Sequence, residues 1–162
     1  MSFELTQISD ALMKAINYAD RHGVICVASA GNDGQSGLVY PAAFGNVIGV
    51  ASVDQQDEQS SFSNFGPDLV QVAAPGEALI TTYPGNHYAA AWGTSFSSAL
   101  IAGTVADLLS AVDPHIAAEL RVDDFERSLS HAKSCGNGHS LGAGCLDYSQ
   151  AIQFIKGTNL PH

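Results

Sequence analysis

The segment Gly93-Thr94-Ser95-Phe96-Ser97-Ser98-Ala99-Leu100-Ile101-Ala102-Gly103 carries the most informative pattern in the chain. Apolar residues continue to Val112 and occur on nearly all sides, which predicts a helix over 95–112 buried in the centre of the molecule. Ser95 lies in the expected first turn, where free backbone N–H groups and the positive end of the helix dipole meet. An oxyanion formed there would be stabilised, as a nucleophilic serine requires. Taken alone, the local sequence favours Thr94 or Ser95 as a simple helix N-cap.

Upstream of this helix, a helical pattern is followed by two apolar runs. Apolar side chains recur at helical spacing from Ile8 to Ala19, and the pattern stops at His22-Gly23, where glycine can end a helix. The runs 24–30 and 47–53 are apolar at consecutive positions, as in strands that are covered on both faces. The order of elements predicts an α/β fold with a parallel sheet.

The rest of the chain shows shorter elements and no division into domains. Residues 54–92 are polar and rich in turns, with short extended pieces around Phe62 to Val72. Apolar spacing predicts a helix over 122–132, and Asp147 is placed to cap a last helix that continues through Ile155. Because no repeat or linker interrupts the sequence, residues 1–162 are expected to belong to a single domain.

The loop Gly31-Asn32-Asp33-Gly34 follows directly after the first predicted strand. In open parallel sheets, ligands bind outside the carboxyl ends of the strands. The amide of Asn32 is therefore a candidate second donor to an oxyanion, although a simple turn asparagine would fit the same local sequence.

Composition excludes several classes of function. The chain has 162 residues, with 6 basic and 16 acidic side chains and a net charge of −10, which disfavours nucleic-acid and anionic-membrane surfaces. No apolar run is long enough to predict a transmembrane helix, and the first residues carry no signal-peptide pattern. Apolar residues make up 46% of the chain, which is typical of a globular protein.

The three cysteines are expected to play different roles, and two of them could pair with each other. Cys26 lies inside an apolar run and is expected to be a buried thiol rather than a reactive one. Cys135 and Cys145 flank a glycine-rich segment that has no zinc-ligand spacing. They could form a local disulfide, which would indicate an oxidising compartment, or remain two free thiols.

Six motifs, in the same order along nearly the whole chain, resemble the subtilisin-like serine proteases, or subtilases. They are Ala30-Gly31-Asn32-Asp33-Gly34, Tyr40-Pro41-Ala42, Ser61-Phe62-Ser63-Asn64-Phe65-Gly66-Pro67, Ala74-Pro75-Gly76, Gly93-Thr94-Ser95 and Gly142-Ala143-Gly144-Cys145-Leu146-Asp147. The resemblance implies a three-layer α/β fold with a mainly parallel sheet.

The resemblance also implies hydrolysis of peptide bonds through an acyl-enzyme, with a peptide or protein as substrate and no cofactor. Ser95 would be the nucleophile, and the Asn32 side chain and the Ser95 N–H would bind the oxyanion. Ser29, Ala30 and Gly31 would border the substrate, as would Ser2 and Phe3. A secreted or extracellular parent protein is expected on the same ground.

Two departures from the family pattern are visible near these motifs. Ser98-Ala99 stands where the family usually has a proline in the helix, so a regular helix is expected. Gln71 stands where some subtilases hold a weak cation with an aspartate. We therefore expect no metal site there.

The largest departure is the absence of the triad's Asp and His motifs. No Asp-Ser/Thr-Gly or His-Gly-Thr-His segment occurs upstream of Asn32. The chain's own histidines (His22, His87, His115, His131, His139 and His162) are more consistent with solvated side chains than with a base for Ser95. A serine without a base is a weak nucleophile.

The sequence therefore predicts the C-terminal part of a subtilase catalytic domain whose N-terminal part is missing, with little or no peptidase activity by itself. The missing N-terminal part would be its partner. The alternative is a non-catalytic peptide-binding or partner-completed interaction module derived from a subtilase.

Overall fold

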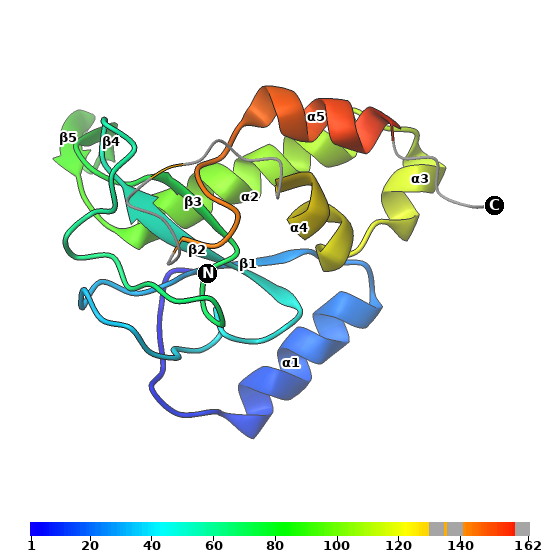
Figure 1. Cartoon of the computed structure of the whole chain (residues 1–162), viewed down its shortest axis with the longest axis horizontal. Coiled ribbons are helices and arrows are strands. Elements are labelled where there is room, and N and C mark those ends of the chain that lie inside the picture. The colour runs from blue at the N-terminus through cyan, green and yellow to red at the C-terminus, as the bar shows by residue number, and fades with distance from the viewer. Residues whose placement is uncertain (130–134, 136–140, 158–162) are drawn as a thin grey trace.

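The computed structural model describes residues 1–129, 135 and 141–157. Three layers are visible in Figure 1, with one helix below the sheet and several above it. The elements are α1 (Asp10–Arg21), β1 (Cys26–Ser29), β2 (Val47–Val53), β3 (Val72–Pro75), β4 (Leu79–Tyr83), β5 (His87–Ala91), α2 (Thr94–Ser110), α3 (Pro114–Glu119), α4 (Val122–Leu129) and α5 (Tyr148–Gly157).

A parallel sheet in the order β1-β2-β3 forms the middle layer. Every residue of β1 and β2 is buried, so the consecutive apolar runs are indeed strands covered on both faces. The prediction of an α/β fold with a mainly parallel sheet is confirmed. The strand predicted over 24–30 is shorter in the structure, while that over 47–53 has the predicted bounds.

Two hydrophobic cores lie on opposite faces of the sheet. Cys26 and Ala28 of β1 belong to the core that includes Ile16 of α1. Val27, between them, belongs to the core that includes Ile101 of α2 and Phe125 of α4. Side chains alternate along β1, so successive residues pack against the helices on opposite faces of the sheet.

Helix α1 begins and ends at the residues that its local sequence favours. The Ser9 side chain accepts a hydrogen bond from Leu12 N, and Gly23, with φ +74°, follows the C-cap His22. Ile8 precedes the helix and is exposed, so the inclusion of Ile8 in the apolar stripe was wrong. The serine cap starts the helix two residues later than the apolar spacing suggested.

Helix α2 packs on one side only, which corrects the prediction of a helix buried on all sides. Ile101, Val105 and Leu108 are buried, but Ala102 and Ala106 are exposed, as is Leu100 at 44%. The sheet, α3 and α5 all contact α2. Among the described residues, nothing covers the opposite face of small side chains.

A β-hairpin that the sequence did not predict lies beside the start of α2. Strands β4 and β5 pair antiparallel, and the turn between them contains Gly85 and Asn86, both with positive φ. Such a turn matches the twist of a hairpin. Ile80, Tyr88 and other hairpin side chains are exposed, so no burial pattern marked these strands.

A disulfide joins two residues of the C-terminal segment, one of which pairs with β3 of the sheet. Cys135 and Cys145 are bonded, with 5.4 Å between their Cα atoms, so the reading as two free thiols was wrong. Cys145 also forms a bridge to Ala73 of β3. Cys26 is a buried thiol as expected, and burial followed by the charge of Asp20 raises its pKa.

The last helix, α5, begins at its predicted cap. Asp147 Oδ1 accepts a hydrogen bond from Gln150 N at 3.0 Å, which confirms it as the cap of α5. Helix α3, capped by Asp113, was not predicted. The expected extension of α4 to residue 132 lies outside the described residues. Within the described ranges, no helix has the length and apolarity needed to cross a membrane.

Leu108 and Leu100 provide a matched test of the one-sided packing of α2. Replacing the fully buried Leu108 with alanine should lower the free energy of unfolding by about 2–5 kcal/mol, because the change leaves a cavity. Leu100→Ala should change it by less than about 0.5 kcal/mol. Urea denaturation followed by circular dichroism measures both variants. Equal losses would contradict the packing described here.

Candidate functional site

Ser95 lies in the first turn of α2, half-buried, immediately after the N-cap Gly93 and Thr94. Gly93 has φ +139°, and its nearest side-chain neighbour is the amide of Asn32. This positive φ favours glycine, whereas a Cβ at this position would make only ordinary contact with the Asn32 amide. Because Gly93 is the N-cap, the reading of Thr94 or Ser95 as a simple cap was wrong.

Asn32 is held against the start of α2 by two hydrogen bonds from Thr94. The backbone N–H of Thr94 donates to Asn32 Oδ1 at 2.9 Å, and Thr94 Oγ1 donates to the same oxygen at 3.0 Å. The carbonyl end of the amide is therefore satisfied, while Nδ2 has no acceptor among the described residues. The residue next to Ser95 thus fixes the orientation of the Asn32 amide.

Thr94 is a site residue whose contribution the sequence did not indicate. It was considered only as a possible cap, yet its side chain is fully buried and reaches back to the loop after β1. Only the approach of two segments 62 residues apart gives its hydroxyl this partner. The resemblance of Gly93-Thr94-Ser95 to a family motif was the one signal that included it.

Asn64 holds the loop that carries Asn32. Its Oδ1 accepts hydrogen bonds from the backbone N–H groups of Asp33 and Gln35, both at 3.0 Å. Its own backbone N–H donates to Gly31 O at 3.1 Å. These three bonds fix the turn, so Asn64 positions Asn32 indirectly.

Backbone and hydroxyl groups at the end of β3 anchor the first turn of α2. Gly93 N donates to Gly76 O at 2.9 Å, and Ser97 Oγ donates to Pro75 O at 3.1 Å. A Cβ at Gly76 would overlap the hydroxyls of Ser97 and Ser52. Glycine at this position therefore permits the close contact between the strand and the helix that carries Ser95.

Ser95 Oγ has no hydrogen-bond partner among the described residues. His22 interacts with the Tyr18 carbonyl at 2.7 Å, His87 lies on β5 and His115 lies in α3. The positions His131, His139 and His162 lie outside the described residues. In the described ranges, no histidine is placed to take the proton of Ser95.

The residues predicted to border the substrate lie together at the end of β1. Ser29 N donates to Met1 O at 3.0 Å, and the amino group of Met1 donates to Val27 O, so residue 1 pairs with the outer edge of β1. This pairing places Ser2 and Phe3, both exposed, next to 29–31. Ala30 is fully buried and Ser29 nearly so, which leaves mainly their backbone available to a substrate.

Two carboxylates lie at the same place. A Cβ at Gly31 would overlap Glu4 Oε2, and the Asp33 carboxylate is close enough to interact with that of Glu4. Burial and then the charge of Asp33 raise the pKa of Glu4 above its ordinary value. Glu4 was not singled out in the sequence because nothing local relates it to Asp33.

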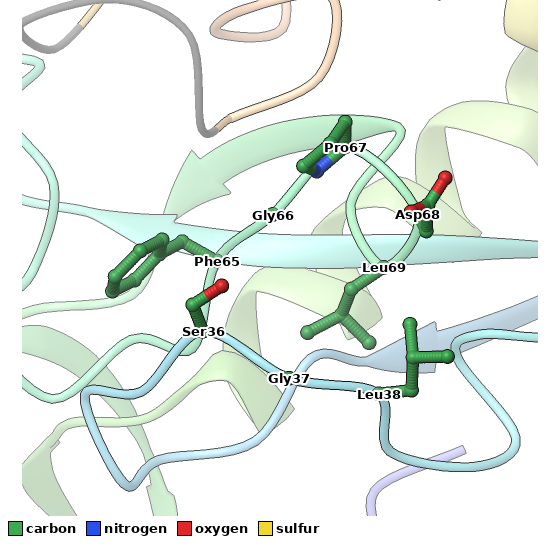
Figure 2. Close-up of a pocket in the computed structure, with 8 residues that line it drawn as sticks. All are labelled: Ser36, Gly37, Leu38, Phe65, Gly66, Pro67, Asp68 and Leu69. Carbon is green, nitrogen blue, oxygen red and sulfur yellow. The ribbon is translucent and has the colours of Figure 1, made fainter.

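No metal-ligating cluster is found in the part of the chain that the structure describes, where no three His, Cys, Asp or Glu side chains converge. Gln71 Oε1 accepts a hydrogen bond from Gly49 N at 2.6 Å. A separate hollow of about 200 Å³ lies between residues 36–38 and 65–69, whose side chains are drawn in Figure 2. Asp68 is its only carboxylate, so it offers too few ligands for a hard cation.

Comparisons with known proteins agree with the fold and the motifs. The profile of the Subtilase family matches residues 3–144. Subtilisin DY of Bacillus licheniformis is 37% identical over 149 residues, which cover 90% of this chain and 53% of that protein. Thermitase of Thermoactinomyces vulgaris is 47% identical over 103 residues, which cover 64% of this chain and 36% of that protein.

Solved structures show the same fold. The prenylagaramide maturation protease PagA superimposes with a TM-score of 0.82 at 27% identity, over 96% of this chain and 59% of that one. The self-cleaved protease domain of PatA gives the same TM-score and identity, over 99% of this chain and 62% of that one. The chain thus spans about half the length of the curated relatives it matches.

Substitutions of Thr94 test whether its hydroxyl holds the Asn32 amide. Thr94→Val keeps the shape but removes one donor, so the free energy of unfolding should fall by about 0.5–1.5 kcal/mol. The NMR signals of the Asn32 side-chain NH₂ should move toward those of a free asparagine. Thr94→Ser, which keeps the hydroxyl, is the control and should retain the native signals. Unchanged signals in Thr94→Val would show that the hydroxyl does not orient Asn32.

Proposed function

This chain belongs to the subtilase family, and we propose that it is the nucleophile-bearing and oxyanion-binding part of a serine endopeptidase domain. The observation that carries the proposal is the pair of hydrogen bonds from Thr94 to Asn32 Oδ1. They hold the Asn32 amide beside the N-terminus of α2, the helix end at which Ser95 lies. A helix N-terminus and an oriented amide are the groups that stabilise an oxyanion.

The proposed chemistry is acyl transfer from a peptide to Ser95. Ser95 Oγ attacks the carbonyl carbon and loses its proton to a base, and the carbonyl oxygen becomes an oxyanion. Asn32 Nδ2 and the Ser95 N–H donate hydrogen bonds to that oxygen. The intermediate collapses, the C–N bond breaks, and the amine leaves with a proton. Water then hydrolyses the acyl-enzyme by the same steps and releases Ser95.

The peptide main chain is proposed to lie along Ser2 and Phe3 on one side and residues 29–31 on the other. Both segments are at the carboxyl end of β1, beside Asn32. Ser2 and Phe3 are exposed, so their backbone groups are open to an extended peptide. This arrangement would bring the scissile carbonyl to the end of α2.

The base for Ser95 is proposed to come from the missing N-terminal part of the same domain, which would make the chain inactive by itself. Two observations support this. The chain spans about half the length of the relatives that it matches. None of the described residues covers the outer face of α2, and Leu79, Ile80, Phe96 and Leu100 line an apolar hollow of about 270 Å³ beside it.

A non-catalytic peptide-binding or interaction module remains the second candidate. It is favoured by the lack of a partner for Ser95 Oγ among the described residues. The DNA sequence upstream of Met1 would distinguish the enzyme from the interaction module. An in-frame continuation that encodes Asp-Ser/Thr-Gly and His-Gly-Thr-His would establish that the chain is part of the enzyme, whereas a stop codon would contradict that proposal.

A secreted or extracellular parent protein is proposed from the Cys135–Cys145 disulfide. Disulfides form and persist in oxidising compartments and are rare in the cytosol.

Labelling with a fluorophosphonate probe tests the proposed function. The chain alone should not be labelled, because Ser95 has no base to activate it. The protein translated from a longer reading frame that includes the Asp and His motifs should be labelled, and Ser95→Ala should abolish the label. Strong labelling of the chain alone at Ser95 would contradict its inactivity. Labelling of the longer protein that survives Ser95→Ala would contradict Ser95 as nucleophile.

A further inference from the structure

We propose that a cluster of buried serine hydroxyls positions the two proposed oxyanion donors, Asn32 and Ser95, relative to each other. The cluster consists of Ser52, Ser63 and Ser97, none of which has any exposed surface. Since none of them can touch a substrate, each acts through another residue and is a positioning residue. The inference rests on the proposed function for the role that it gives to Asn32 and Ser95.

Ser97 ties the segment after Ser95 to the sheet. Its Oγ donates a hydrogen bond to Pro75 O, at the end of β3, at 3.1 Å. The segment before Ser95 is tied to the neighbouring residue, because Gly93 N donates to Gly76 O at 2.9 Å. Ser95 therefore lies between two attachments to the same turn, and the loss of either would let the first turn of α2 move.

Ser63 supports the loop that carries Asn32. Strand β1 ends before the level of Ser52 in the neighbouring strand β2. Ser63 Oγ accepts a hydrogen bond from Ser52 N at 2.9 Å and donates one to Asn64 O at 3.0 Å. The hydroxyl thus joins β2 to Asn64, whose side chain fixes the turn after Asn32.

Ser52 lies between these two supports. A Cβ at Gly76 would overlap both Ser52 Oγ and Ser97 Oγ, so the two hydroxyls lie against the same glycine. Ser52 Oγ is also 2.7 Å from Ser60 Oγ, which is buried as well. Buried polar groups that are fully hydrogen-bonded make a core rigid. The end of β2 therefore links the turn at Gly76 to the loop that begins at Ser60.

The bond that Ser97 makes differs from the usual bond of a helical serine. Such a hydroxyl commonly bonds to a carbonyl in the preceding turn of its own helix, as Ser128 does with Phe125 O in α4 at 2.8 Å. The Ser97 hydroxyl reaches a strand instead. A bond between two elements fixes the distance between them, here between α2 and β3, and so determines where Ser95 lies.

Ser97→Ala tests the attachment of the helix, in the ¹⁵N-labelled chain at pH 7 without substrate. Amide hydrogen exchange of Gly93 and Thr94 should become at least about fivefold faster, as expected for the loss of one hydrogen bond. The NMR signals of the Asn32 side-chain NH₂ should move toward those of a free asparagine, because Thr94 then holds the amide less firmly. If circular dichroism shows that Ser97→Ala is unfolded, Ser97→Cys, which keeps a weak donor, is measured and should shift the signals in the same direction.

Ser63→Ala tests the support of the loop in the same way. Exchange of the Asp33 and Gln35 amides, which donate to Asn64 Oδ1, should become at least about fivefold faster. The Asn32 side-chain signals should move in this variant too, because the loop that carries them is no longer fixed.

Ser128→Ala is the matched control, because it removes a buried hydroxyl that also donates to a backbone carbonyl but lies in α4. It should leave the Asn32 signals and the exchange of the site amides unchanged. Asn32 signals that stay in place in Ser97→Ala and Ser63→Ala would overturn the proposal. Signals that move in only one of these two variants, or that move equally in Ser128→Ala, would overturn it as well.

These measurements separate the positioning role from the proposed function. They are made without substrate and do not require Ser95 to act as a nucleophile. A longer protein that fails to react with the fluorophosphonate probe would contradict the proposed function alone. Unmoved Asn32 signals, with labelling of the longer protein at Ser95, would contradict the role of the serine cluster alone.

Discussion

The site depends on one contact between distant parts of the chain, in which Thr94 donates two hydrogen bonds to Asn32 Oδ1. This contact joins the loop after β1 to the first turn of α2. Both ends of it are supported: Asn64 fixes the loop, and Gly76 and Pro75 at the end of β3 fix the helix. The parallel sheet brings these ends to one edge, so its strand order is what makes the contact possible.

Some surfaces around the site are covered by packed side chains, and others are exposed. One face of α2 packs on the sheet around Ile101 and Leu108, and no other part of the described structure covers the opposite face, which carries Leu100. The outer edge of β1 is paired only by Met1 among the described residues. In a chain that spans about half the length of its curated relatives, these open surfaces fit the proposal that a further part of the domain supplies the base for Ser95.

The sequence alone predicted those elements whose structure is determined by a local pattern of residues. The consecutive apolar residues of 47–53 predicted β2 because a strand buried on both faces needs no alternation. The hairpin of β4 and β5 was missed because its side chains are largely exposed. The one-sided burial of α2 was missed because most residues on its open face, such as Ala102 and Ala106, are small and apolar, and Leu100 is apolar as well. Among the site residues, the motifs indicated Ser95 and Asn32, whereas the contributions of Thr94, Asn64 and Glu4 come from long-range contacts that no local pattern records.

Amide hydrogen exchange at Thr94 tests the central contact most directly. N–H groups in the first turn of a helix have no partner within the helix and normally exchange without protection. Because Thr94 N donates to Asn32 Oδ1, its exchange should be slowed at least about tenfold, the equivalent of one hydrogen bond. Ser95 N–H, which has no acceptor among the described residues, should exchange rapidly, and Asn32→Ala should remove the protection of Thr94. Equally fast exchange of Thr94 and Ser95 in the native chain would contradict the account.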